Sequence, residues 1–265
     1  MDVIFTDLDG TLLDGETYSW EAARPALDRL RHLGIPWVPV TSKTRAETEW
    51  WRERFSHCHP FIVENGGAVF ISQDYFPFVP ERTVTRDGFH VIELGIPYER
   101  LTGALASASR ASGCPVRGFG AMNAEEVAER CGLPLAHARL ARRREYDEPF
   151  LVLDPAKADS LAAAIEALGF HCTCGGRFWH ILGRSDKAEA VRRLAELFRR
   201  VHTEIRTIGL GDGLNDASFL NTVDIPILIR SAQSAELQKL VPRGRATACP
   251  GPEGWNQAVI HLIGA

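Results

Sequence analysis

The sequence predicts an α/β fold: a doubly wound parallel-sheet core with an α+β unit inserted into it. Short apolar runs alternate with amphipathic helical patterns at both ends of the chain, which is typical of parallel sheets. Several of these runs end in acidic, hydroxyl or glycine-containing turns, where ligand clefts of such sheets form. The pattern changes near Pro80. We therefore expect residues 1–82 and 185–265 to form the core and residues 83–184 to form the inserted unit.

Composition excludes several classes of protein. With 265 residues, 45% of them hydrophobic and 24% charged, the chain has an ordinary globular composition. Its net charge of −4 argues against a general nucleic-acid binder. No apolar run approaches the roughly 20 residues that cross a bilayer, and no basic leader precedes the first strand. We expect a cytoplasmic protein whose six scattered cysteines are reduced and hold no zinc.

The first strand and its turn carry the strongest signal. Residues 3–5 are β-preferring, and Asp7 and Asp9 follow immediately, with Gly10 allowing the chain to turn. Two carboxylates this close repel each other unless a cation lies between them, and Mg²⁺ prefers hard oxygen ligands and bridges to phosphate. The competing interpretation is an ordinary surface turn in which each Asp bonds its own backbone.

A helix and a second strand follow. Ser19 can cap a helix whose regular part begins near Pro25 or kinks there. Residues 35–40 are apolar on both sides, which favours a buried parallel strand despite two prolines. Thr41 and Ser42 come next, as hydroxyls suited either to binding phosphate or simply to capping the following helix.

Residues 45–55 predict a helix, and residues 61–63 and 68–71 predict strands. The Asn65-Gly66 pair between the two strands is typical of a hairpin turn.

The inserted unit contains predicted strands at 89–94 and 150–153 and predicted helices at 98–109, 124–131 and 157–168. Three consecutive arginines that end at Arg144 usually form a solvated helix end. Gly176 permits close backbone approach to a ligand, and Arg177 brings a guanidinium suited to carboxylate or phosphate.

The chain then returns to the core pattern. Lys187 opens a long amphipathic helix, although a cation there has the wrong sign for the helix dipole. Residues 205–210 predict a strand that runs into Asp212, Asn215 and Asp216, which form either a turn or the second half of a metal site. Residues 225–229 predict the last core strand, and residues 251–256 precede a closing helix.

Residues 7–13, Asp-Leu-Asp-Gly-Thr-Leu-Leu, closely resemble motif I of the haloacid dehalogenase superfamily. The resemblance implies a phosphatase in which Asp7 is the nucleophile, Asp9 is the acid–base residue and Gly10 lies at the phosphate. It also implies that Thr41, or less directly Ser42, is the motif II hydroxyl and that Lys187 is the motif III lysine. Its implied magnesium ligands are Asp7, Asp9, Asp212 and Asp216. Asn215 would hold Lys187 or the substrate, and Asn65 would lie in a loop beside the active site.

Four further segments are similar to the mannosyl-3-phosphoglycerate phosphatase family: residues 41–44, 144–150, 175–180 and 251–256. That family uses magnesium to release phosphate from its substrate and yields mannosylglycerate, a compatible solute. The substrate also carries a carboxylate, which would be bound by groups from a set comprising Arg144, Gly176, Arg177 and His180. Gly213 and Ala188 depart from the family pattern without removing a catalytic group. The choice between mannosyl and glucosyl substrates stays open.

Three other functions remain possible at this stage. A different sugar-phosphate phosphatase or a phosphomannomutase-like mutase could share the fold. A non-catalytic sugar-phosphate sensor would be expected to lose Asp9, which is present.

Overall fold

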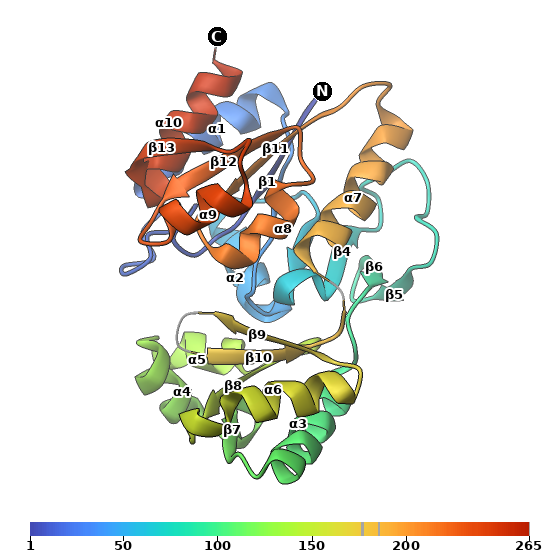
Figure 1. The fold of residues 1–265 in the computed structure, drawn as a ribbon. Coiled ribbons are helices and arrows are strands. Elements are labelled where there is room, and N and C mark those ends of the chain that lie inside the picture. Colours follow the sequence, from blue (N-terminus) through green and yellow to red (C-terminus); the bar gives the residue numbers. More distant parts are fainter. Residues whose placement is uncertain (176–177, 185, 265) are drawn as a thin grey trace.

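A five-stranded parallel sheet in the order β13-β12-β11-β1-β2 forms the centre of the upper lobe in Figure 1. The computed structural model describes residues 1–175, 178–184 and 186–264. The strands of this core sheet are β1 (Asp2–Thr6), β2 (Trp37–Pro39), β11 (Arg206–Gly211), β12 (Ile225–Arg230) and β13 (Arg245–Pro250). Because β1 lies between β2 and β11, the first strand of the chain pairs in the middle of the sheet with a strand from the C-terminal part of the chain.

Helices cover both faces of the core sheet, so the doubly wound prediction is confirmed. Successive side chains of a strand point to opposite faces. Ile4 accordingly packs in one buried cluster with Trp255, and Phe5 packs in the other with Phe198. One face is covered by α1 (Arg24–Leu33), α2 (Arg45–Phe55) and α10 (Gly251–Ile263), the other by α7 (Lys187–Val201), α8 (Ala217–Leu220) and α9 (Ser234–Leu240).

Helix starts follow ordinary capping chemistry. Thr44 accepts a hydrogen bond from the backbone N–H of Glu47, whose side chain accepts one from the Thr44 N–H, so α2 begins with a capping box. Pro25 occupies the first turn of α1, where its missing N–H costs nothing. Short 3-10 turns lie at Glu21–Ala23, Glu64–Gly66, Phe119–Ala121, Pro155–Lys157 and Leu214–Asp216.

A second sheet, antiparallel in the order β3-β4-β6-β5, extends from the edge of the core. Its strands are β3 (Phe61–Val63), β4 (Ala68–Ser72), β5 (Val84–Arg86) and β6 (Phe89–Glu93). A parallel bridge between Val40 and Ile62 links it to the core sheet. The sequence-based division after residue 82 would have assigned β5 and β6 to the inserted unit. Instead β6 pairs with β4, and β5 pairs with β6; Val91 of β6 is buried in the same cluster as Phe70 of β4.

The lower lobe in Figure 1 is an antiparallel sheet, β7-β8-β10-β9, backed by helices; we call this lobe, residues 98–182, the cap. Its elements are β7 (Val116–Gly118), β8 (Asp147–Val152), β9 (His171–Gly175), β10 (Phe178–Leu182), α3 (Tyr98–Ser112), α4 (Ala124–Cys131), α5 (Leu135–Ala141) and α6 (Ala158–Ala167). Leu101 of α3 and Ile165 of α6 pack on one face of the sheet around Phe150. The opposite face, which includes His171 and His180, is directed to the core lobe.

The cap contacts the core on two sides. Near the start of α2, the Thr44 hydroxyl donates to the Leu140 carbonyl at 3.1 Å, and the rings of Trp50 and His137 lie 4.2 Å apart. At the β3–β4 turn, the buried Glu64 carboxylate accepts hydrogen bonds from the backbone N–H groups of residues 145 and 146. These contacts hold the cap over the carboxyl edge of the core sheet.

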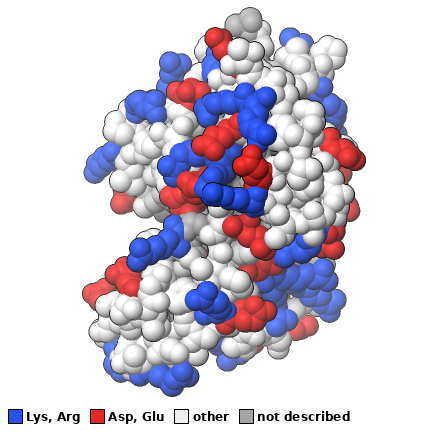
Figure 2. Space-filling model, turned by 90° about the vertical axis from the view of Figure 1, so that its right-hand side faces the viewer, with Lys and Arg blue, Asp and Glu red and all other residues white. Residues whose placement is uncertain are grey.

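Acidic and basic side chains lie interspersed on the face drawn in Figure 2. Among the described residues, no helix combines the length and the apolar character needed to cross a membrane.

Candidate active site

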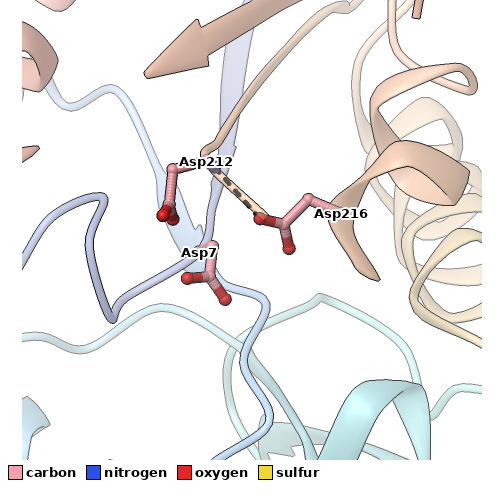
Figure 3. Close-up of side chains that lie close together, drawn as sticks. All are labelled: Asp7, Asp212 and Asp216. Carbon is pink, nitrogen blue, oxygen red and sulfur yellow. Dashed lines mark hydrogen bonds between the residues drawn. The ribbon is translucent and has the colours of Figure 1, made fainter. Parts of the chain in front are cut away.

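Three carboxylates converge at the carboxyl edge of the core sheet (Figure 3). Asp7 directly follows β1, and Asp212 directly follows the neighbouring strand β11. Asp216 lies at the start of α8. Each contributes an oxygen atom to a group in which all the atoms lie within 4.8 Å of one another. Because parallel strands end at the same edge, residues 205 positions apart in sequence meet here.

Lys187 neutralises part of this cluster. Its Nζ donates to Asp7 Oδ1 at 2.7 Å and to Asp216 Oδ1 at 2.6 Å, and the side chain is 1% exposed. Asp186 caps α7 by accepting from the Glu189 N–H at 2.8 Å. The lysine at the start of α7 is thus explained by its ion pairs with Asp7 and Asp216, which lie outside the helix.

The cluster is short of positive charge. Burial raises the pKa of Asp7 well above its usual value; Lys187 opposes this shift, whereas Asp216 and Asp212 add to it. Burial, reinforced by Asp216, raises the pKa of Asp212 to about 7. Burial disfavours the Lys187 ammonium, yet Asp216 and Asp7 more than offset this effect and raise its pKa. Three carboxylates, two of them buried and one partly buried, with one ammonium are a donor set that fits a divalent cation with hard oxygen ligands.

Neighbouring groups hold the carboxylates in place. Thr11 donates its hydroxyl to Asp212 Oδ1 at 2.7 Å. Asp216 Oδ2 accepts from the backbone N–H groups of Asp212, at 3.1 Å (dashed in Figure 3), and of Gly213, at 3.0 Å. Gly10 has φ of +77°, and a Cβ there would lie 2.5 Å from Asp212 Oδ2, so glycine is needed for both reasons.

Asp9 is not part of the three-carboxylate group, although the sequence predicted it as a metal ligand. Its Oδ1 lies 2.8 Å from Nζ of Lys43, which is 7% exposed and follows the adjacent strand β2. Glu47 lies 4.0 Å from the same ammonium. The turn at Gly10 therefore directs Asp9 toward β2, whereas Asp7 faces β11. Sequence reasoning missed Lys43; its place in the short segment between β2 and α2, beside the two hydroxyls, was the available signal.

The two hydroxyls after β2 have different surroundings. Thr41 is fully buried, and its Oγ1 accepts from the Lys43 N–H at 3.1 Å. Ser42 lines the cavity. Thr41 thus makes a hydrogen bond within the loop that leads to α2, and Ser42 is the cavity-lining hydroxyl of the pair, whereas the sequence analysis ranked Thr41 first.

A cavity of about 1000 Å³ lies between the cap and the core, with the carboxylates at its base. Its lining includes several residues predicted from sequence: Asp7, Asp9, Ser42, Asn65, His180, Lys187, Asp212, Asn215 and Asp216. It also includes residues that sequence reasoning missed: Glu166, Phe170, His171, Thr173, Arg184 and Gln233. The period-2 alternation of β9 was the signal for two of them, because His171 and Thr173 share one face of the strand.

Arg144 does not line the cavity. It is buried and donates to the Ser42 carbonyl at 3.1 Å and to Asp147 Oδ2 at 3.0 Å. The sequence pattern of three arginines could not show this, because Ser42, 102 residues away in sequence, becomes a neighbour of Arg144 only in the folded chain. Gly176 and Arg177, also predicted at the substrate, lie outside the described residues.

The β3–β4 turn is both a hairpin and part of the cavity. β3 and β4 pair antiparallel, and Asn65 adopts φ of +57° between them. Its side chain reaches the cavity wall, so the two interpretations of this segment are compatible.

Comparison with known proteins identifies the family. Residues 4–85 match the model of haloacid dehalogenase-like hydrolases. The chain is 44% identical to the glucosyl-3-phosphoglycerate/mannosyl-3-phosphoglycerate phosphatase of Methanococcoides burtonii, over 99% of this chain and 97% of that protein. It is 38% identical to the protein of the same name from Persephonella marina, over 98% and 97%. A solved haloacid dehalogenase subclass IIB sugar phosphatase superposes with a TM-score of 0.69 at 17% identity, covering 99% of both chains, which supports the fold. The chain belongs to the mannosyl-3-phosphoglycerate phosphatase family of haloacid dehalogenase-like hydrolases.

Proposed function

We propose that this protein is a magnesium-dependent phosphatase that hydrolyses mannosyl-3-phosphoglycerate or its glucosyl analogue through an aspartyl-phosphate. The observation that carries the proposal is the placement of Asp7 beside Lys187, Asp212 and Asp216 at the base of a cavity covered by the cap. The names of the two relatives above supply the substrate class.

The metal would be held by Asp7, Asp212 and Asp216, whose oxygens suit Mg²⁺. When bound, it would neutralise charge on the nucleophile and the phosphoryl oxygens, which otherwise repel each other.

Asp7 is the nucleophile. Lys187 engages its Oδ1, so we assign the attack on phosphorus to the second carboxylate oxygen. The bond from phosphorus to the ester oxygen breaks as the bond to Asp7 forms. Water later attacks the same phosphorus, releases inorganic phosphate and restores the Asp7 carboxylate.

Asp9 is the general acid and base. It gives a proton to the leaving ester oxygen and later takes one from the attacking water. Its side chain is 40% exposed toward the cavity and held by Lys43, so it can reach both the ester oxygen and water without entering the metal cluster. We therefore propose Asp9 as acid and base rather than as a ligand.

The phosphoryl oxygens need donors in the transition state. Lys187 supplies an ammonium, and the Ser42 hydroxyl and the Asn215 amide line the same cavity. His171 and His180 of the cap sheet, and Arg184 in the segment that follows β10, are placed to contact the glycosylglycerate part of the substrate. The cap excludes bulk water and recognises this leaving group.

Phosphate release from a substrate panel tests the proposal. The panel contains mannosyl- and glucosyl-3-phosphoglycerate, 3-phosphoglycerate, mannose 6-phosphate and sucrose 6-phosphate, each with Mg²⁺ and with a chelator. We expect the glycosyl-phosphoglycerates to be the best substrates, turnover to stop with chelator, and Asp7→Asn to abolish it. Asp74→Asn, an exposed aspartate in the loop after β4, is the matched control and should be fully active.

Preference for sucrose phosphate or a simple sugar phosphate would contradict the substrate assignment. Retained turnover in Asp7→Asn would contradict the mechanism. Transfer of phosphate within a hexose phosphate, without release, would instead indicate a mutase.

A further inference from the structure

One buried carboxylate joins the cap to the core at the cavity wall. Asp147, the first residue of β8, is fully buried. Its Oδ2 accepts from Asn65 Nδ2 and from Arg144, each at 3.0 Å. Both of its oxygens lie 3.0 Å from Nδ1 of His180. Asn65 belongs to the core hairpin and His180 to the cap sheet, so a single anion binds a residue from each lobe.

Strand register explains this arrangement. β8 and β10 pair antiparallel with Asp147 opposite Leu182, so His180 is the diagonal neighbour of Asp147 on the same face. Asn65 reaches the same anion from the left-handed position of the β3–β4 turn. Arg144 supplies the compensating charge, which is needed because an unpaired buried carboxylate is strongly disfavoured.

Asp147 stays ionised in this setting. Burial alone would raise its pKa, but His180 and Arg144 hold the pKa below its usual value. An ionised carboxylate can only accept hydrogen bonds. The ring of His180 must therefore place a proton on Nδ1, and the amide of Asn65 must turn Nδ2 toward Asp147.

These two hydrogen bonds determine which atoms of His180 and Asn65 remain for other partners. With its Nδ1–H donated to Asp147, His180 keeps Nε2 as its second hydrogen-bonding atom, and Asn65 presents Oδ1, which is buried without a hydrogen-bond partner among the described residues. Both residues line the cavity. An amide oxygen and an imidazole nitrogen on the wall of one cavity suit a ligand rich in hydroxyl groups, because a hydroxyl both donates and accepts hydrogen bonds.

We propose that Asp147 is a positioning residue that keeps a proton on Nδ1 of His180 and fixes the Asn65 amide orientation, so that cap and core together present hydrogen-bonding groups to the hydroxyls of the substrate's leaving group. This proposal rests on the proposed phosphatase function. It assigns recognition of a polyhydroxylated leaving group to a pair of side chains that meet only when the cap lies on the core.

Nitrogen-15 NMR of the histidine rings tests, without any substrate, whether Asp147 determines which ring nitrogen of His180 carries a proton. The signals of His180 are identified by their loss in His180→Gln. At neutral pH we expect Nδ1 of His180 to carry a proton in the wild type, and Asp147→Asn to shift the ring toward the tautomer that is protonated only on Nε2. An Nε2–H tautomer in the wild type would overturn the proposal.

Enzyme kinetics test whether Asp147 and His180 contribute to recognition of the leaving group. With glycosyl-phosphoglycerate we expect Asp147→Asn and His180→Gln each to lower kcat/KM at least about tenfold, while p-nitrophenyl phosphate, which has no leaving-group hydroxyl, changes less than about twofold. The double variant should be no worse than His180→Gln if Asp147 acts on recognition mainly through that ring. Asp159→Asn, an exposed aspartate on α6 of the cap, is the matched control.

Equal losses on both substrates would show that Asp147 is merely structural and overturn the proposal. If Asp147→Asn does not fold, His180→Gln decides. A ratio of kcat/KM for glycosyl-phosphoglycerate to kcat/KM for p-nitrophenyl phosphate that equals the wild-type ratio overturns the proposal. Absence of turnover on every phosphate ester, with the wild-type tautomer as expected, would instead refute the phosphatase function and leave the positioning geometry intact.

Discussion

Replacing Lys187 by methionine removes the one ammonium that contacts two of the three clustered carboxylates. The side chain is 1% exposed, and its Nζ lies 2.7 Å from Asp7 and 2.6 Å from Asp216. Breaking a buried ion pair by removing one partner costs about 3–5 kcal/mol, since the remaining charge is left without compensation. For a chain of this size, this cost corresponds to a fall in Tm of roughly 6–20 °C.

The same substitution should nearly abolish catalysis. Loss of one preorganised group that stabilises transition-state charge lowers kcat about 10²–10³-fold. Mg²⁺ should recover more of the lost Tm in Lys187→Met than it adds to the wild type, because the cluster then holds one positive charge fewer. Thermal melts with and without Mg²⁺, together with phosphate release, measure both effects. Lys239→Met, on the exposed side of α9, is the matched control.

A fall in Tm below about 2 °C together with more than a tenth of wild-type activity would refute the reasoning, because Lys187 would then contribute neither stability nor charge.

Three further predictions concern groups around this cluster. Lys43→Gln should lower kcat about tenfold or more with little change in KM, because Asp9 loses the partner 2.8 Å away that orients it; equal effects on kcat and KM would contradict this. In metal-free protein, the Asp212 pKa of about 7 exceeds its usual 3.8, so the folded state binds the proton more tightly and stability should fall as pH rises from about 4 to about 7. Tm measured across that range should slope less in Asp212→Asn, and parallel slopes would show that Asp212 does not contribute. Glu64→Ala should lower Tm by several degrees, because the buried Tyr146 N–H and the partly buried Glu145 N–H, just before β8, lose their acceptor, whereas the exposed Glu81→Ala should leave Tm unchanged.

The sequence predicted the strands and turns of the core well where one short segment contains both the apolar run of the strand and the polar turn that follows it. The strand and turn through Asp7 and Gly10 contain both the apolar run and the acidic turn, so the sheet edge could be located. The closing helix was placed too late, because Gly251 and Pro252 suggested a loop; both lie in the first turn of α10, where neither disrupts a hydrogen bond.

Long-range pairing could not be predicted from the same patterns. Whether β6 pairs with β4 or with the cap sheet depends on contacts distant in sequence, and its alternation is compatible with either. The same limit applies to Arg144, because its contact with the Ser42 carbonyl is known only once the cap lies on the core. Lys43 was missed for a related reason, since a lysine beside Ser and Thr is a common helix start until Asp9 is found opposite it.

The central position of β1 has a consequence for biosynthesis. One neighbour, β2, is made almost at once, but Arg206 of the other, β11, pairs with Asp2 and lies 204 residues further along. At ordinary translation rates, about 10–40 s separate the two segments on the ribosome. During that interval the nascent chain carries an apolar strand with one side open to other chains, while the later-made cap can already fold on itself. Chaperone demand in the cell should therefore centre on the emerging N-terminal segment.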